Sequence, residues 1–205
     1  MSEYHNTKAE DRVPLGQKLA VGAGGFPIQN GGLIVQYMAQ PIFQIFLGLN
    51  PALFGLAMTI PRIWDAFTDP VMGRISDRTQ SRYGRRRPYV FVGALAVALT
   101  FLTIWMVPQS MGDTGTFLWL TIGSVLFFTA FTVFSVPFNA LVYEQTPDYH
   151  ERTRLMFYLA LFYNIGNLCV NWYVPATNWS GFENPLVGAR WIALGLALVV
   201  FLGMG

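Results

Sequence analysis

Charged residues are scarce in this sequence: Asp, Glu, Lys and Arg make up 12% of its 205 residues, while 53% are hydrophobic. Soluble domains carry roughly 25% charged residues, so this chain cannot cover a water-exposed surface in the usual way. Its single cysteine, Cys169, excludes an internal disulfide. The two histidines, His5 and His150, are isolated, and no metal cluster or nucleophile triad occurs in the sequence. These absences argue against an enzyme, and the net charge of only +2 argues against nucleic-acid binding.

Long apolar runs are abundant instead. A helix needs about 20 apolar residues to cross a hydrocarbon layer of about 30 Å, and several runs reach that length. The sequence therefore predicts an all-α membrane protein with an exposed N-terminal tail over residues 1–18 and a six-helix transmembrane bundle over 19–205. No cleavable signal peptide is evident. The expected helices cover residues 19–48, 51–76, 89–107, 116–143 and 153–176, with a sixth beginning near 186.

The basic residues predict the orientation of this bundle. Of the thirteen Lys and Arg residues, eleven fall in the tail and in the second and fourth connections, Arg62 lies within a span, and Arg190 falls on the other side. By the positive-inside rule, the N-terminus and the even-numbered connections face the cytoplasm. The expected location is the inner membrane of the cell, with several passes.

Three charges lie within the second predicted helix, at Arg62, Asp65 and Asp69. Spacings of three, four and seven residues place them on one face. A charge near the bilayer centre costs about 2.5 to 3.5 kcal/mol, so each needs compensation. One interpretation is mutual neutralisation that pins helices together. The other is an ion-coupling site, in which the two carboxylates share a hard monovalent cation or a proton, and Thr132 adds a hydroxyl oxygen.

Neutral polar side chains form stripes on three other predicted helices. They include Gln29 and Gln36 in the first, Ser135 and Asn139 in the fourth, and Asn164 in the fifth. Amides beside aromatic residues suit a sugar, which has apolar faces and polar edges. We therefore predict a substrate-binding face here. Interhelical hydrogen bonding by the same residues is the competing interpretation.

An arginine-rich loop follows the second helix, between Arg82 and Arg87. Most of its arginines are expected to enforce topology and to contact anionic lipid. Asp77 is different, because an acid among arginines at a helix end can pair across helices and hold one conformation.

The motifs in this region resemble known transporters. Gly73, Asp77 and Arg78, followed by Gly84-Arg85-Arg86-Arg87, resemble the loop between helices two and three of the major facilitator superfamily. A narrower resemblance is to the glycoside-pentoside-hexuronide cation symporter family, typified by melibiose permease. It is carried by Arg62-Ile63-Trp64-Asp65-Ala66, Asp69-Pro70 and Met72-Gly73, while residues 76–88 are also similar to sucrose-type transporters.

The resemblance implies the N-terminal six-helix half of a twelve-helix transporter, built as two inverted three-helix repeats. It implies a sodium or proton site at Asp65, Asp69 and Thr132, with no cofactor besides the coupling ion. It also implies a conformational latch made from the loop motif. That latch comprises Gly73, Asp77, Arg78, Arg85 and Arg86. The charged sugar ligands of melibiose permease are replaced here by uncharged residues.

The expected function is cation-coupled symport of a sugar or glycoside by alternating access. The expected partners are this small solute, the lipid bilayer, and a C-terminal six-helix half or a second half-transporter. Because the sequence stops inside the sixth helix, a fragment is favoured. The alternatives are a non-transporting membrane sensor or assembly protein, or an inactive transporter fragment.

Overall fold

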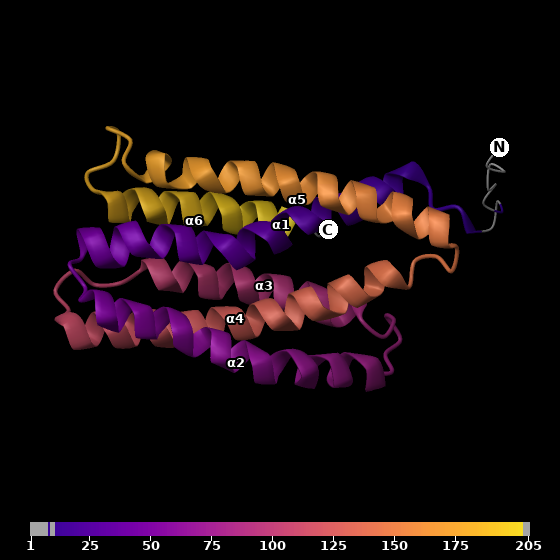
Figure 1. Ribbon diagram of the computed structural model, residues 1–205, viewed down its shortest axis with the longest axis horizontal. Helices are drawn as coiled ribbons and strands as arrows, with labels where there is room; N and C mark the ends of the chain where they lie inside the picture. The colour runs from indigo at the N-terminus through magenta and orange to yellow at the C-terminus, as the bar shows by residue number, and fades with distance from the viewer. Residues whose placement is uncertain (1–7, 9–10, 203–205) are drawn as a thin grey trace.

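The computed structural model describes residue 8 and residues 11–202, apart from the side chains of residue 29 and residues 200–202. The described chain is helical and contains no strand. Figure 1 shows the helices running alternately in opposite directions along the long axis of the molecule. They are α1 (Leu15–Ala39), α2 (Pro51–Arg78), α3 (Arg87–Trp105), α4 (Asp113–Tyr143), α5 (Tyr149–Thr177) and α6 (Pro185–Leu202), with a π-helical segment η2 (Gln40–Phe46) after α1. The predicted all-α, six-helix architecture is confirmed.

The helix starts differ most from the sequence-based expectation. α2 begins at Pro51 as predicted, and the Asn50 side chain caps it by accepting a hydrogen bond from the Ala52 N–H at 2.9 Å. α1, α4 and α5 instead begin at Leu15, Asp113 and Tyr149, each earlier than expected. Their first turns are polar, so the apolar pattern alone does not reveal them. α1 continues through Pro27 to Ala39, where the π-helical segment η2 follows it.

Helix packing reveals two related halves. α1 packs mainly against α5 and α2 against α4, while α3 packs against α6 and along α4. If α1, α2 and α3 are matched with α4, α5 and α6, the α1–α5 pair corresponds to the α4–α2 pair. The α3–α6 pair then corresponds to itself. Because α1 and α4 run in opposite directions (Figure 1), the two three-helix units are inverted relative to each other.

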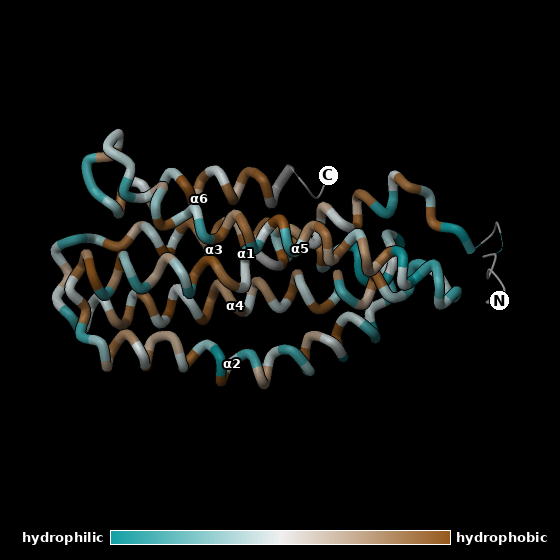
Figure 2. The backbone as a smooth tube through the Cα atoms, turned by 45° about the horizontal axis from the view of Figure 1, so that its top comes forward, coloured by the Kyte–Doolittle hydropathy of each residue, from teal (hydrophilic) through white to brown (hydrophobic). Residues whose placement is uncertain are grey.

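Polarity differs strongly among the helices. Within the described residues, α3 and α4 are long and apolar enough to span a membrane by length and composition, and residues 185–199 of α6 form a shorter apolar helix. Figure 2 shows hydrophilic residues at the ends of the bundle and along the middle of α2. Among the remaining long helices, α2 carries Arg62, Asp65 and Asp69, and α1 and α5 carry polar stripes.

Close packing of α3 on α4 depends on a glycine. A Cβ atom at Gly93 would lie 2.7 Å from the Phe134 backbone nitrogen, so a larger residue there would push the helices apart. Beside this contact, Phe101 packs edge-on against the fully buried Trp105, with ring centroids 5.8 Å apart.

The ends of the bundle differ in charge. The start of α1 and the α2–α3 and α4–α5 connections lie at one end (Figure 1), and these segments together with the helix ends next to them carry most of the basic residues. At the opposite end, Arg190 of α6 donates hydrogen bonds to the carbonyl oxygens of Trp105 at 3.0 Å and Val107 at 3.3 Å. Its charge is thus used to satisfy the open C-terminal carbonyls of α3.

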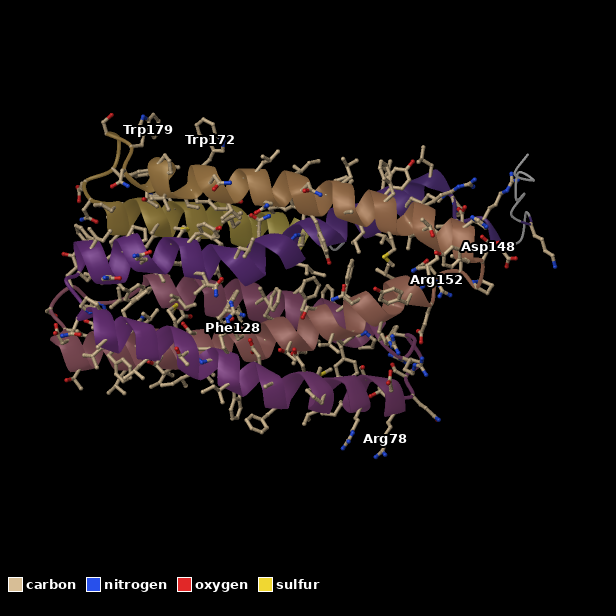
Figure 3. The ribbon with its side chains drawn as sticks, viewed as in Figure 1. Arg78, Phe128, Asp148, Arg152, Trp172 and Trp179 are labelled. Carbon is tan, nitrogen blue, oxygen red and sulfur yellow. The ribbon has the colours of Figure 1, made fainter. Side chains whose placement is uncertain are left out.

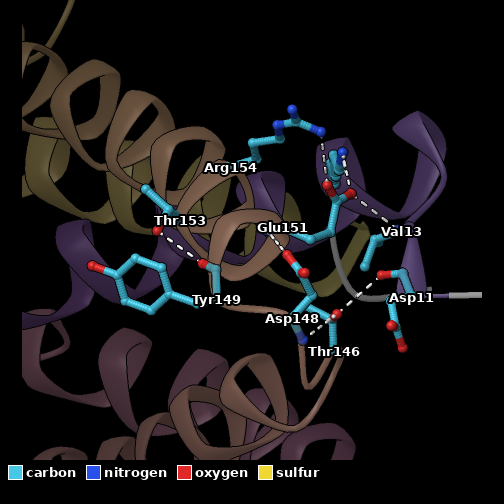
Figure 4. A network of polar contacts seen from close by, with 9 residues as sticks. Asp11, Val13, Thr146, Asp148, Tyr149, Glu151, Thr153 and Arg154 are labelled. Atoms are coloured by element: carbon cyan, nitrogen blue, oxygen red, sulfur yellow. Dashed lines mark hydrogen bonds and ion pairs between the residues drawn. The ribbon is translucent and has the colours of Figure 1, made fainter. Parts of the chain in front are cut away.

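A fully buried glutamate, Glu151, anchors the start of α1 to α5 (Figure 4). Its Oε1 atom accepts a hydrogen bond from the Val13 N–H at 3.0 Å and lies 2.5 Å from Lys18 Nζ. Its Oε2 atom lies 3.2 Å from Nη1 of Arg154. Two cations and one amide therefore compensate a single buried carboxylate.

The α4–α5 turn also holds the residues around the start of α1, through hydrogen bonds. The Thr146 hydroxyl donates to the Asp11 carbonyl oxygen at 3.0 Å, and Asp148 caps α5 by accepting from the Glu151 N–H at 2.7 Å. Arg152 donates to the Thr146 carbonyl oxygen at 3.0 Å. Residues 11–18, predicted as part of an exposed tail, are thus bound to the bundle. Residues 1–7, 9 and 10 of that tail lie outside the described residues.

Replacing Glu151 with glutamine should destabilise the chain by about 3 kcal/mol, because removing one partner of a buried ion pair leaves the other uncompensated. The measurement is the free energy of unfolding in detergent. Glu183→Gln is the matched control, since Glu183 is exposed and its replacement should change stability by less than about 0.5 kcal/mol. Equal effects of the two variants would contradict the role of Glu151.

The same carboxylate should make stability depend on pH. Burial by itself raises the pKa of Glu151, but the hydrogen bonds from Lys18 and the Val13 N–H and the Lys18 charge outweigh it, so the pKa lies below 4.5. Its stabilising contribution is therefore complete above about pH 4.5 and declines as the pH falls through the lower folded-state value. The stability difference between the wild type and Glu151→Gln should narrow on acidification from pH 7 to pH 3. A difference that stays constant over this range would refute the expectation.

Candidate functional site

Two helices, α2 and α4, bring the predicted ion-coupling residues together. The Thr132 hydroxyl of α4 donates a hydrogen bond of 2.8 Å to Oδ1 of Asp69 on α2. Thr132 is buried and Asp69 is exposed, so this partly buried contact lies at the edge of the seam between the helices. The structure therefore joins two of the predicted residues directly, across 63 positions of sequence.

Asp65 lies one helical turn before Asp69 and is only partly compensated. Its Oδ2 atom is 3.7 Å from Nη1 of Arg62, which is too long for a strong hydrogen bond. Its Oδ1 atom is buried and has no hydrogen-bond donor among the described residues. A buried carboxylate oxygen without a donor carries a desolvation cost that ordinary packing does not offset.

Aromatic contacts fix the neighbouring groups. The Arg62 guanidinium lies 4.5 Å from the centre of the ring of Phe128 on α4, a cation–π contact. Phe128 is labelled in Figure 3. Two residues further along α2, the Trp64 indole N–H donates to the Thr129 hydroxyl at 2.8 Å. Sequence reasoning missed Phe128 and Trp64, although Phe128 lies one turn before Thr132 on the same face of α4.

The predicted substrate-binding residues are placed less conclusively. Ser135 is buried, Asn139 is half-buried, and Gln36 and Asn164 are exposed. The Asn164 amide donates to the Ala160 carbonyl oxygen of its own helix at 2.8 Å. In the part of the chain that the structure describes, no hydrogen bond joins these residues to one another, and the side chain of Gln29 lies outside that part. A shared substrate face therefore stays a prediction.

Another polar residue of α1, Asn30, illustrates the structural use of an amide. It is buried, donates to the Phe26 carbonyl oxygen at 2.9 Å and accepts from the Tyr173 hydroxyl of α5 at 2.7 Å. A Cβ at Gly166 would lie 2.6 Å from its Nδ2 atom. Asn30 thus fastens α1 to α5 at a close approach of the two helices.

The predicted latch also comes together in part. Nη2 of the buried Arg86 lies 2.5 Å from Oδ1 of Asp77, at the end of α2, and 3.2 Å from Oε1 of Glu144, just beyond α4. Arg85 pairs with the same glutamate. The ends of α2, α3 and α4 are therefore cross-linked by charge. Sequence reasoning missed Glu144, whose position directly after a long apolar helix was the available signal.

Two predicted latch residues stand apart from this network. Arg78 is exposed and points away from the bundle (Figure 3). A Cβ added to Gly73 would meet only Val136, at 4.0 Å. Packing within these six helices therefore does not explain why residue 73 is a glycine.

Six helices in two inverted repeats, with charges held along the α2–α4 seam, define a class: membrane bundles of the kind from which secondary transporters are built. Comparison with known proteins agrees, because the family model described as MFS/sugar transport protein matches residues 20–204. The chain belongs to this family of the major facilitator superfamily, and it is accordingly a membrane protein.

Similar proteins include symporters from bacteria and animals. The chain is 34% identical over 164 residues to the uncharacterized symporter YnaJ of Bacillus subtilis, covering 80% of this chain and 35% of that protein. It is 32% identical to the sodium-dependent lysophosphatidylcholine symporter 1-A of Danio rerio, covering 66% of this chain and 25% of that protein. It is 27% identical to the putative glycoside/cation symporter YagG of Escherichia coli, covering 92% and 40% respectively. The chain thus spans well under half the length of these relatives.

The latch makes a specific prediction about stability. Arg86→Gln should lower the free energy of unfolding by about 1 to 3 kcal/mol, because it removes a buried group that serves two carboxylates. Arg78→Gln, which removes the same charge from an exposed arginine nearby, should change it by less than about 0.5 kcal/mol. Denaturation in detergent measures both. Arg86→Gln and Asp77→Asn should also be less than additive in combination, and full additivity would show that the two residues are not coupled.

Proposed function

We propose that the whole protein, of which this chain would form the N-terminal half-bundle, is a cation-coupled symporter for a small solute. The observation that carries the proposal is the buried Oδ1 atom of Asp65, which lacks a donor beside the Asp69–Thr132 pair. The seam offers this carboxylate oxygen too little positive charge to offset its burial. We therefore expect it to bind a ligand that supplies positive charge.

The charge balance at the seam supports a cation or a proton. Asp65 and Asp69 carry two negative charges, and Arg62 supplies one positive charge that is drawn toward the Phe128 ring. One negative charge is left over. Two carboxylates and a hydroxyl are hard oxygen donors suited to Na⁺, and a proton shared between the carboxylates would meet the same need. The described residues contain no group of three or more His, Cys, Asp or Glu that would favour a transition metal instead.

The solute is proposed to be a sugar or glycoside. Support comes from the uncharged polar residues Ser135 and Asn139 on α4, on the turns that follow Thr132, and from the glycoside named for YagG. Gln29, Gln36 and Asn164 complete the proposed face. Another relative is named for lysophosphatidylcholine, so labelled lysophospholipid belongs in any transport panel as the competing solute.

Transport would follow alternating access, in which this bundle rocks against a second six-helix half. By the positive-inside rule, the N-terminus and the Arg86 latch would face the cytoplasm. The proposed location is the inner membrane of the cell. Asp77, Arg85, Arg86 and Glu144 would then hold the cytoplasmic ends of α2, α3 and α4 together as one body. The open space beside Gly73 would allow close approach of a helix of the other half.

The test is cation-driven uptake by the whole protein in proteoliposomes, with separate sodium and proton gradients and a panel of labelled glycosides. Asp69→Asn keeps an oxygen that accepts the Thr132 hydrogen bond, so the fold should persist while the charge is lost. Cation affinity should fall about 10- to 100-fold in Asp69→Asn and in Asp65→Asn, the range for losing a charged hydrogen-bonding partner.

Asp113→Asn is the matched control, because Asp113 is an exposed acid in the first turn of α4, far along the helix from Thr132. Uptake by this variant should be unchanged. Undiminished coupling in the Asp65 and Asp69 variants would refute the proposal and favour a membrane protein that keeps the fold without transporting.

A further inference from the structure

The arginines of the α2–α3 loop fall into two groups. Arg85 and Arg86 are engaged by the carboxylates of Asp77 and Glu144. Arg82 and Arg87 are exposed, and no carboxylate of the described residues pairs with either of them. The loop therefore presents two uncompensated positive charges outward, next to two that are satisfied internally.

A surface concavity of about 860 Å³ lies between these two arginines. Its lining combines two basic residues with apolar ones, and it runs from the loop onto the first two turns of α3. The lining residues are Arg82, Tyr83, Gly84, Arg87, Pro88, Phe91 and Val92. Gly84 sits at the bend with φ +97°, a conformation that side chains disfavour, so the loop needs glycine to fold back here.

Two contacts with Tyr83 hold the Arg82 side chain in place before any ligand binds. Its Nη2 atom donates to the Tyr83 hydroxyl at 2.6 Å, and its guanidinium lies 4.7 Å from the centre of the Tyr83 ring. A guanidinium has five N–H donors, so most remain available to an anion. Holding the side chain on the ring reduces the entropy that binding would otherwise cost.

The apolar part of this lining continues along α3 as an exposed stripe. Phe91, Val92, Leu95 and Leu99 are all exposed on one side of this helix, and no polar residue interrupts them. From Phe91 to Leu99 the stripe is roughly 12 Å long at 1.5 Å per residue. α3 is also one of the two helices that meet the length and composition needed to span a membrane. This stripe is therefore suited to hydrocarbon chains.

We propose that the Arg82–Arg87 concavity is a binding site for an anionic phospholipid. The phosphate lies between the two guanidinium groups, and an acyl chain lies along Phe91, Leu95 and Leu99. Charge complementarity selects the anionic headgroup, and the uninterrupted apolar stripe selects a lipid over a soluble phosphate. Arginine suits the first role because its planar fork matches phosphate oxygens bidentately.

The test measures binding of phosphatidylglycerol and phosphatidylethanolamine to the delipidated full-length protein by native mass spectrometry. Phosphatidylglycerol should bind the wild type more tightly, and Arg82→Gln and Arg87→Gln should each weaken that binding about fivefold, the expected contribution of one arginine near an anionic membrane surface. Phosphatidylethanolamine binding should change little. Phe91→Gln should also weaken the phosphatidylglycerol complex, because it interrupts the stripe.

Arg74→Gln is the matched control, since it removes one charge from an exposed arginine at the same end of α2 and should leave lipid affinity unchanged. Equal weakening by Arg74→Gln would reduce the effect to general surface charge and overturn the site. Competition by inorganic phosphate at concentrations similar to those of the lipid would overturn the assignment to a lipid. Unfolding temperatures of all variants verify that binding is compared between folded proteins.

Discussion

The structure depends on how a few charges are compensated inside a bundle that has little charge to spare. Along the α2–α4 seam, the Thr132–Asp69 hydrogen bond and the Arg62–Phe128 contact compensate two charged groups with neutral partners. Neither contact delivers a full opposite charge to Asp65. These contacts therefore hold α2 against α4 but leave the charge of Asp65 only partly compensated. A site for a small cation requires such a charge.

Charge is handled differently at the arginine-rich end of the bundle. There Arg86 joins Asp77 to Glu144, and Glu151 joins Lys18 to Arg154, so carboxylates and cations are matched locally. Matched pairs hold helix ends in place and leave no demand for a ligand. These matched pairs contrast with Oδ1 of Asp65 at the seam, which has no hydrogen-bond donor among the described residues, and with Arg82 and Arg87 of the same end, which pair with no carboxylate of the described residues.

The sequence predicts the number of helices and the composition of the seam because both follow from local spacing. Apolar runs define the six helices, and the three-, four- and seven-residue spacings place Asp65 and Asp69 with Arg62. Contacts between residues far apart in the sequence cannot be predicted from local spacing. Phe128 and Glu144 acquire their roles only when α4 packs against α2 and the loop before α3, which no local pattern encodes. The early starts of α4 and α5 were missed for a related reason, since a polar first turn looks like a loop until its cap is seen.

The anchoring of α1 by Glu151 has a consequence for biosynthesis. A ribosome releases Val13 and Lys18 long before it makes Glu151, which follows Val13 by 138 positions. Until Glu151 has been synthesised, the start of α1 therefore lacks the carboxylate that holds it. The start of α1 is fixed in place only once α2, α3 and α4 have been made and the first turn of α5 has followed them.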